Sequence, residues 1–439
     1  MSGYAHGVHR STASLLCYGC LVAVAPTQSA QYLDDFEFVA ATAQRTFPAF
    51  EKKSVDWPSV CRRLRPRFAA ARHDAEHVLN LHRLLAELRD THSSVRETNI
   101  DVRSPLFDGQ ASGGLWVVPG DEGALLVRAL APGHPLAAAI APGDEVIEID
   151  GQSAASYLDN LRARAKTWRG FSSQHFLDGL LGTQFFAFGA ADSVRVVVRS
   201  ADGGTAEREV HHGIELDARA CDSPPGFQPE GRARALRLDG GIAYLRILGK
   251  MDDATAAEAS AQIDDCADAT GFILDCRGMG GGGDRPALEI AGRFFREVRD
   301  NGTFLPIKPT GAWQFAGPLV LLQDASLASS AETFTWSLTE TGRAVSVGRP
   351  TAGATIIPKL YELPSGLAVI RIGAKDRPTP VRGVRPEGIG SAPDVFVKFD
   401  RAAFEGGRDP ILETGRAVLQ ALLRGDSAEA VIAAHRGSD

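Results

Sequence analysis

Between residues 242 and 348 apolar segments alternate with segments of helical periodicity, and this alternation constrains the fold more than any other feature. Each of the first three strand-like segments is followed by a helix-like one, which is typical of a sheet covered by helices. We therefore predict an α/β core at 225–400, entered through a linker rich in proline. The strand-like segments are 242–248, 271–275, 318–322 and 344–348, and the helix-like segments are 253–267, 286–295 and 329–341.

The remaining residues divide into four further regions. Residues 1–30 resemble an export signal, because an uncharged run from Ala13 to Ala25 follows His9-Arg10 and small residues close the segment. Helical periodicity predicts an N-terminal helical region at 31–100. Strand patterns and an Asp-Gly turn predict a β-rich domain at 112–212, and a C-terminal helical tail is expected at 401–439.

Composition and charge exclude several classes of protein. The net charge of −7 is spread along the chain and gives no electrostatic case for nucleic-acid binding. Because the N-terminal segment resembles an export signal, we expect a periplasmic or secreted protein, and no segment is long and apolar enough to span a bilayer. The residues before Cys20 form a poor lipid-attachment motif, which disfavours an anchor there. Four further cysteines match no zinc pattern, and one disulfide of unknown pairing could form among Cys61, Cys221, Cys266 and Cys276.

Ser329 is the first candidate for a reactive side chain. It lies where the strand-like segment 318–322, after a turn of small residues, gives way to a helix. A serine there faces backbone N–H groups and the positive end of the helix dipole, which favour developing negative charge. The alternative is an N-cap, with Glu332 completing a capping box, and the segment alone favours that interpretation.

A glycine run, Gly278 to Gly283, follows the strand-like segment 271–275. Its spacing satisfies the G-x-G-x-x-G dinucleotide fingerprint, but no carboxylate ends a strand about twenty residues later. The missing lysine and Ser/Thr exclude a P-loop. Bare N–H groups beside a nucleophile would serve as an oxyanion hole, the role we favour over phosphate binding or a structural turn.

Six segments in one order resemble the tail-specific, or C-terminal-processing, serine peptidases, and more closely their tricorn-core branch. Together they span about residues 90–395. These segments are Leu88-Arg89-Asp90-Thr91-His92-Ser93, Pro142-Gly143-Asp144, Leu274-Asp275-Cys276-Arg277 with Gly281-Gly282, Ala328-Ser329-Ser330-Ala331-Glu332, Gly348-Arg349-Pro350-Thr351-Ala352-Gly353 and Glu387-Gly388-Ile389-Gly390-Ser391-Ala392-Pro393-Asp394.

The resemblance implies a catalytic set and a fold. Ser329 would be the nucleophile, His92 the general base and Glu387 the group that orients the histidine, a chemically consistent triad. Ala354 stands where the branch that uses a catalytic lysine carries it. The oxyanion donors would be backbone N–H groups of Gly281 or Gly282 and of Ser330. The implied fold is a crotonase/ClpP-like core of repeated β-β-α units, and neither metal nor organic cofactor is implied.

The β-rich segment resembles a PDZ domain inserted before the core, on the Pro-Gly-Asp…Ile-Asp-Gly run of residues 142–151. Such a domain would bind an extended peptide, including a C-terminus, as an added strand, here at Gly114, Leu115 and Trp116, and would deliver substrate or gate the cleft. We thus expect an exported serine endopeptidase acting on proteins or peptides. A catalytically silent peptide- or lipid-binding protein of the same fold is the alternative, and a nucleotide-dependent enzyme the least favoured one.

Overall fold

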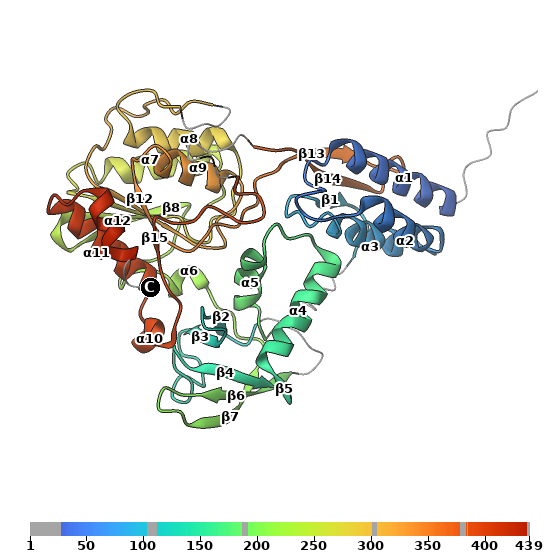
Figure 1. The fold of residues 1–439 in the computed structure, drawn as a ribbon, viewed down its shortest axis with the longest axis horizontal. Coiled ribbons are helices and arrows are strands. Elements are labelled where there is room, and N and C mark those ends of the chain that lie inside the picture. Colours follow the sequence, from blue (N-terminus) through green and yellow to red (C-terminus); the bar gives the residue numbers. More distant parts are fainter. Residues whose placement is uncertain are drawn as a thin grey trace, which may run out of the picture.

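The computed structural model describes residues 28–102, 112–186, 192–300, 305–377, 383 and 385–436. They form three lobes, an N-terminal lobe, a β-rich lobe and a core lobe that contains the largest share of the chain (Figure 1). The expected export signal lies almost entirely outside the described residues. No described helix is long and apolar enough to cross a membrane.

The core lobe is built on a six-stranded sheet in the order β15-β12-β11-β10-β9-β8. All neighbouring pairs are parallel except β8–β9. Successive residues of β11 point to opposite faces, so Leu321 packs with α7, α8 and α9 while Val320 packs with α11 and α12. The predicted α/β fold is confirmed. The strands are β8 (Ala233–Leu238), β9 (Ile242–Ile247), β10 (Phe272–Asp275), β11 (Leu319–Gln323), β12 (Val345–Gly348) and β15 (Val395–Phe396), and the helices are α7 (Asp253–Asp264), α8 (Asp284–Ala291), α9 (Ser330–Thr339), α11 (Pro410–Leu423) and α12 (Ala428–Arg436).

The N-terminal lobe combines three helices with a sheet that the sequence did not reveal. Strand β1 (Ser94–Thr98) pairs with β14 (Ala368–Lys375), which pairs in turn with β13 (Ile357–Glu362). Strands β13 and β14 therefore form a hairpin that belongs to the predicted core in sequence but packs in the N-terminal lobe. There Ile370 and Ile372 join the apolar core of that lobe. The helices are α1 (Gln28–Thr46), α2 (Trp57–Ala69) and α3 (Asp74–Ala86). The side chain of Asp56 caps α2 by accepting a hydrogen bond from the Ser59 N–H (3.1 Å).

The β-rich lobe contains a sheet in the order β2-β3-β4-β6-β7 with antiparallel neighbours, flanked by two helices. Helix α4 rises from this sheet toward the N-terminal lobe (Figure 1). Its elements are β2 (Leu115–Pro119), β3 (Leu125–Leu130), β4 (Glu145–Ile149), β5 (Gln152–Ser153), α4 (Ala154–Trp168), α5 (Gln174–Thr183), β6 (Ser193–Arg199) and β7 (Thr205–His211). The short helices α6 (Ala218–Cys221) and α10 (Arg401–Phe404) lie at the boundary with the core lobe. The likeness of this lobe to a PDZ domain stays a prediction.

The four cysteines expected after the signal are free thiols in the structure. Cys266 and Cys276 are buried in the core lobe, and Cys61 and Cys221 are partly buried. Burial raises the pKa of Cys61 and of Cys221 to about 11, which keeps both thiols protonated at neutral pH. Burial also raises the pKa of Cys266 and of Cys276, so none of the four thiols has the character of a nucleophile.

Candidate active site

Ser329 lies at the junction between β11 and α9, immediately before the first helical residue. Its backbone angles, φ 61° and ψ −126°, are sparsely populated for a residue with a side chain. The carboxylate of Glu332 accepts hydrogen bonds from the Ser329 N–H (3.1 Å) and from the N–H of Gly353 (3.0 Å) and the hydroxyl of Thr351 (2.6 Å). Glu332 thus fastens the strained turn to the loop that follows β12.

Glu332 is fully buried, and its pKa reflects that burial. Burial raises the pKa of Glu332 to about 7, against the hydrogen bond from Thr351 that favours the charged form. The predicted N-cap interpretation is partly met, because Glu332 does reach back to the N-cap backbone. Capping and exposure of a reactive hydroxyl at Ser329 are therefore compatible.

The glycine run lies against this turn. The N–H of Ala328 donates to the carbonyl of Met279 (3.0 Å), and a Cβ at Gly281 would stand 2.6 Å from the Ser329 Cβ. Gly281 has φ +88°, so both its conformation and its surroundings require glycine. Within the described residues, the backbone N–H groups of Gly281, Gly282 and Ser330 donate to no acceptor. Gly281 and Ser330 thus lie beside Ser329 with N–H groups that have no partner among the described residues, and their role as oxyanion donors stays a prediction.

His92 reaches Ser329 from the N-terminal lobe. Its ring Nε2 lies 3.0 Å from Ser329 Oγ, although 237 residues separate the two in sequence. Arg371 of β14 donates to the His92 carbonyl (2.6 Å). Next to it, the N–H of Thr91 donates to Ser172 Oγ (3.2 Å) and the N–H of Ser172 to Thr91 Oγ1 (2.9 Å), which ties this loop to the β-rich lobe. All three lobes therefore contribute to the position of the ring.

Glu387 lies beside His92 without being joined to it. Its Oε2 accepts hydrogen bonds from the backbone N–H groups of Thr355 (2.7 Å) and Ile356 (3.1 Å), and its Oε1 forms an ion pair with Lys53 Nζ (2.6 Å). His92 Nδ1 has no hydrogen-bond partner within the described structure. The structure thus brings Ser329 and His92 together, whereas the carboxylate is held by a lysine.

Burial and neighbouring charges set the protonation of these groups. Burial of the ring, and then the positive charge of Arg371, lower the pKa of His92 to about 4. Burial acts to raise the pKa of Glu387, but the ammonium of Lys53 brings it below its usual value. Burial and the nearby Glu387 raise the pKa of Asp90 to about 6. At neutral pH His92 is therefore an unprotonated base and Glu387 is charged.

Lys53 and Arg371 are the neighbours of the site that sequence reasoning missed. Lys53 lies in the turn between α1 and α2, and its Nζ also donates to the carbonyl of Arg89 (2.8 Å). The sequence around it, Glu51-Lys52-Lys53-Ser54, is ordinary for an exposed turn. Arg371 belongs to the hairpin whose return to the first lobe was not predicted. Neither residue carried a local signal.

Gly114, Leu115 and Trp116 lie at the start of β2, the edge strand of the β-rich sheet. The free edge is covered by α5, where a Cβ at Gly182 would overlap the carbonyl oxygen of Val117. Leu115 points into the lobe's core, and Trp116 lines a cavity of about 340 Å³ that faces the core lobe. In this arrangement β2 has no room for an added strand beside Val117.

Comparisons with known proteins agree with this architecture. Residues 241–397 match the family described as "Peptidase family S41". A carboxyl-terminal-processing protease from Picosynechococcus sp. is 32% identical over 110 residues, which cover 24% of this chain and 27% of that protein. The match thus spans about a quarter of the relative's length. A crystal structure of mature CPAF superposes with a TM-score of 0.66 at 15% identity, covering 91% of this chain and 99% of that one, which shows a shared fold.

Proposed function

Residues 241–397 form a Peptidase family S41 domain, the domain of a family of serine-type peptidases, and we propose that this chain is an exported serine endopeptidase acting through Ser329. The observation that carries the proposal is the 3.0 Å contact between His92 Nε2 and Ser329 Oγ. Nucleophile and base at this distance meet the geometric requirement for acyl transfer. In this proposal the substrates are proteins or peptides in the compartment to which the enzyme is exported.

The mechanism follows from the positions of the side chains. His92 accepts the hydroxyl proton as Ser329 Oγ attacks the scissile carbonyl carbon. The N–H groups of Ser330 and of Gly281 or Gly282 then stabilise the oxyanion. His92 returns its proton to the leaving amine as the peptide C–N bond breaks, and a water molecule attacks the resulting ester by the same route, releasing Ser329.

Glu387 assists His92 through its charge in this proposal. Its carboxylate favours the imidazolium that forms as His92 takes the proton, and it fixes the backbone of Thr355 and Ile356 beside the ring. Its ion pair with Lys53 keeps it ionised, which that role needs. A direct hydrogen bond to His92 Nδ1 would require Glu387 to exchange Lys53 for the ring.

Binding of peptide at the β-rich lobe is the remaining part of the proposal. Gly114, Leu115 and Trp116 lie on an edge strand, which is the element that accepts an added strand. Because α5 covers that edge, an extended peptide would pair with β2 only after α5 moves away. The lobe would in that way couple peptide binding to a change at Ser172, which lies just before α5, and at Thr91, which lies just before His92.

Hydrolysis of an unfolded protein tests the proposal. Wild-type protein should cleave reduced casein, and Ser329→Ala should lower the rate by at least about 10³-fold because the nucleophile is lost. Ser260→Ala, at a half-buried serine of α7 that has no role in the proposed site, is the matched control and should retain full activity. Equal turnover by Ser329→Ala and wild type would refute the assignment. An inactive wild type that still binds peptide or lipid would favour the silent binding protein.

A further inference from the structure

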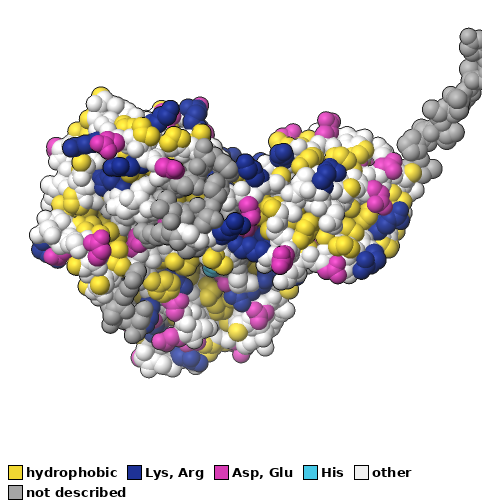
Figure 2. All heavy atoms as spheres, turned by 45° about the horizontal axis from the view of Figure 1, so that its top comes forward, with side chains coloured by type: hydrophobic (Ala, Val, Ile, Leu, Met, Phe, Trp, Pro, Cys, Tyr) yellow, Lys and Arg dark blue, Asp and Glu magenta, His cyan; other side chains and the backbone are white. Residues whose placement is uncertain are grey.

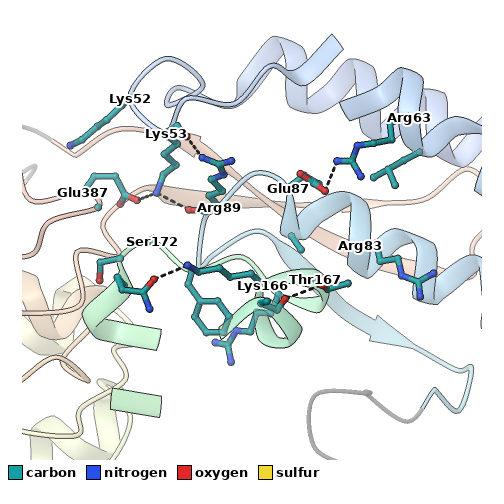
Figure 3. Close-up of a pocket in the computed structure, with 18 of the residues that line it drawn as sticks. Lys52, Lys53, Arg63, Arg83, Glu87, Arg89, Lys166, Thr167, Ser172 and Glu387 are labelled. Carbon is teal, nitrogen blue, oxygen red and sulfur yellow. Dashed lines mark hydrogen bonds and ion pairs between the residues drawn. The ribbon is translucent and has the colours of Figure 1, made fainter. Parts of the chain in front are cut away.

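A cavity of about 870 Å³ lies where the N-terminal lobe meets α4 and the loop that carries Glu387. Figure 3 shows residues of α2, α3 and α4 that line it, with Lys53 and Glu387 at one end. Its volume lies within the range of about 300–1,000 Å³ that is usual for ligand pockets. The cavity is separate from the glycine run and the oxyanion donors, none of which lines it.

The lining of this cavity is strongly basic. It contains eight Lys or Arg residues and two Glu residues. Both glutamates are already paired, Glu87 with Arg63 and Glu387 with Lys53, each at 2.6 Å. The other six cations form no ion pair with any carboxylate of the described residues, and they are Lys52, Arg67, Arg83, Arg89, Lys166 and Arg169.

Burial destabilises the charged form of two of these side chains. Burial lowers the pKa of Arg169 and of Arg83, and the latter is lowered further by the charge of Arg67. The chain as a whole carries a net charge of −7, so a basic concentration here is a local feature. Lys and Arg side chains gather along the junction of the lobes in Figure 2. A concave, partly desolvated surface of one charge raises the local concentration of the opposite charge.

We propose that this basic cavity binds an acidic segment of the polypeptide substrate, an inference that rests on the proposed function. The cations are spread along three helices and a turn rather than gathered at one point, which suits carboxylates distributed along a chain. Ser172 lines the cavity and also contacts Thr91, the residue before His92. A peptide bound there lies next to the loop that positions the base, so recognition and cleavage act on one chain.

The charge of Arg169 also acts on Arg371, a neighbour of His92. Arg371, which donates to the His92 carbonyl, has a pKa lowered to about 10 by burial and by the charges of Arg96 and Arg169. Carboxylates bound beside Arg169 offset this positive charge and favour protonation of His92. Hydrolysis of an acidic substrate should therefore lose its rate at a higher pH, on the acidic side, than hydrolysis of a neutral substrate.

Fluorescence anisotropy tests binding without requiring hydrolysis. The probes are a fluorescein-labelled peptide of alternating Glu and Ser and the same peptide with Gln for Glu, both mixed with Ser329→Ala protein. We expect the Glu peptide to bind at least about tenfold more tightly, with affinity that falls as salt rises. Equal affinities for the two peptides would overturn the proposal.

Charge variants locate the site. Arg67→Glu combined with Lys166→Glu should weaken binding of the Glu peptide by about tenfold or more, since both side chains are exposed and line the cavity. The neutral pair Arg67→Gln and Lys166→Gln should give a smaller loss in the same direction. Arg234→Glu, an exposed position on β8 outside the cavity, is the matched control and should leave the affinity unchanged. An equal loss in the control would place binding elsewhere.

Two further measurements distinguish this proposal from a nucleic-acid site and from an acidic-peptide site on a protein without peptidase activity. A single-stranded oligonucleotide of equal charge that binds more tightly than the Glu peptide, and is lost in the same variants, would overturn the assignment to polypeptide. Quenched fluorogenic peptides with Glu or Gln flanks measure hydrolysis by wild-type protein, where the Glu form should have the lower KM. Binding that survives without any hydrolysis would support an acidic-peptide site while removing the peptidase function and the substrate role.

Discussion

The two halves of the candidate site are built in different ways. Ser329 and the glycine run follow neighbouring parallel strands, β11 and β10, so one sheet edge brings them together. His92, Glu387 and Lys53 come from a turn after α3, a loop before β15 and a turn before α2. Their meeting depends on contacts between lobes. The nucleophile half is therefore a property of one sheet, and the base half is a property of the whole assembly.

This difference predicts different sensitivities. Changes at the nucleophile half act on backbone strain and close contact, which resist small adjustments. Changes at the base half act on ion pairs and long-range charge, so their effects depend on pH and on the partner that remains. Substitutions in the two halves should therefore differ in size of effect and in pH dependence.

The largest effect in the base half is expected for His92→Ala. Removal of the group that accepts the Ser329 proton in the proposed mechanism should lower kcat/KM for casein-derived peptides by at least about 10³-fold. His211→Ala, at an exposed histidine of β7, is the matched control and should retain full activity. A loss below tenfold for His92→Ala would mean that another group activates the serine.

Gly281→Ala tests the nucleophile half. The new Cβ would stand 2.6 Å from both the Ala328 carbonyl oxygen and the Ser329 Cβ, at a φ of +88°. Displacement of the turn and of an oxyanion donor should lower kcat by about 10²-fold or more and also lower the Tm. At Gly280 a Cβ meets nothing within 4 Å, so Gly280→Ala should be nearly silent. Similar kinetics for the two variants would contradict the described packing.

Glu387→Gln and Lys53→Met test the ion pair between the lobes. Each single change leaves one buried charge without its partner and should lower the free energy of unfolding by about 3–5 kcal/mol. The double variant should recover most of that stability in thermal unfolding but keep a loss of about tenfold in kcat, since the charge beside His92 is gone. A loss as large as that of His92→Ala would show that the working enzyme has a direct Glu387–His92 hydrogen bond.

The smallest effect at neutral pH is expected for a substitution that changes only the pH dependence of kcat/KM. Because the pKa of His92 is lowered to about 4, the acid limb of kcat/KM should fall near that value and not near 6.5. In Arg371→Gln a cation that disfavours the imidazolium is removed, so the pKa rises and activity is lost at a higher pH. Arg234→Gln should leave the limb in place. A limb near 6.5 in wild type would contradict the burial of the ring.

The same lowered pKa has a consequence for folding. In the unfolded chain the pKa of His92 is near its ordinary value of 6.5, whereas in the folded chain this pKa is lowered to about 4. As the pH falls through this window the unfolded state binds more protons, so the free energy of unfolding decreases. This contribution vanishes above the unfolded value.

Some features of the fold and of the candidate site follow from local sequence patterns, and others do not. The place of Ser329 follows from a local strand–turn–helix pattern, and the α/β core follows from the same alternation. The position of His92 was implied only by resemblance to a family. The return of Ile370 and Ile372 to the first lobe and the ion pair of Lys53 with Glu387 were not predicted. Both depend on tertiary packing. Apolar periodicity shows which face of a helix or strand is buried, but it does not show which other element covers that face.

In the proposed mechanism Ser329 is a nucleophile that His92 activates from another lobe. Labelling with a fluorophosphonate, followed by mass spectrometry of the modified peptide, tests it most directly, because only an activated hydroxyl reacts quickly. We expect a single adduct on Ser329 in the wild-type protein and none, on the same time scale, in His92→Ala. An adduct on another residue, or equal labelling of Ser329 in both proteins, would contradict the account.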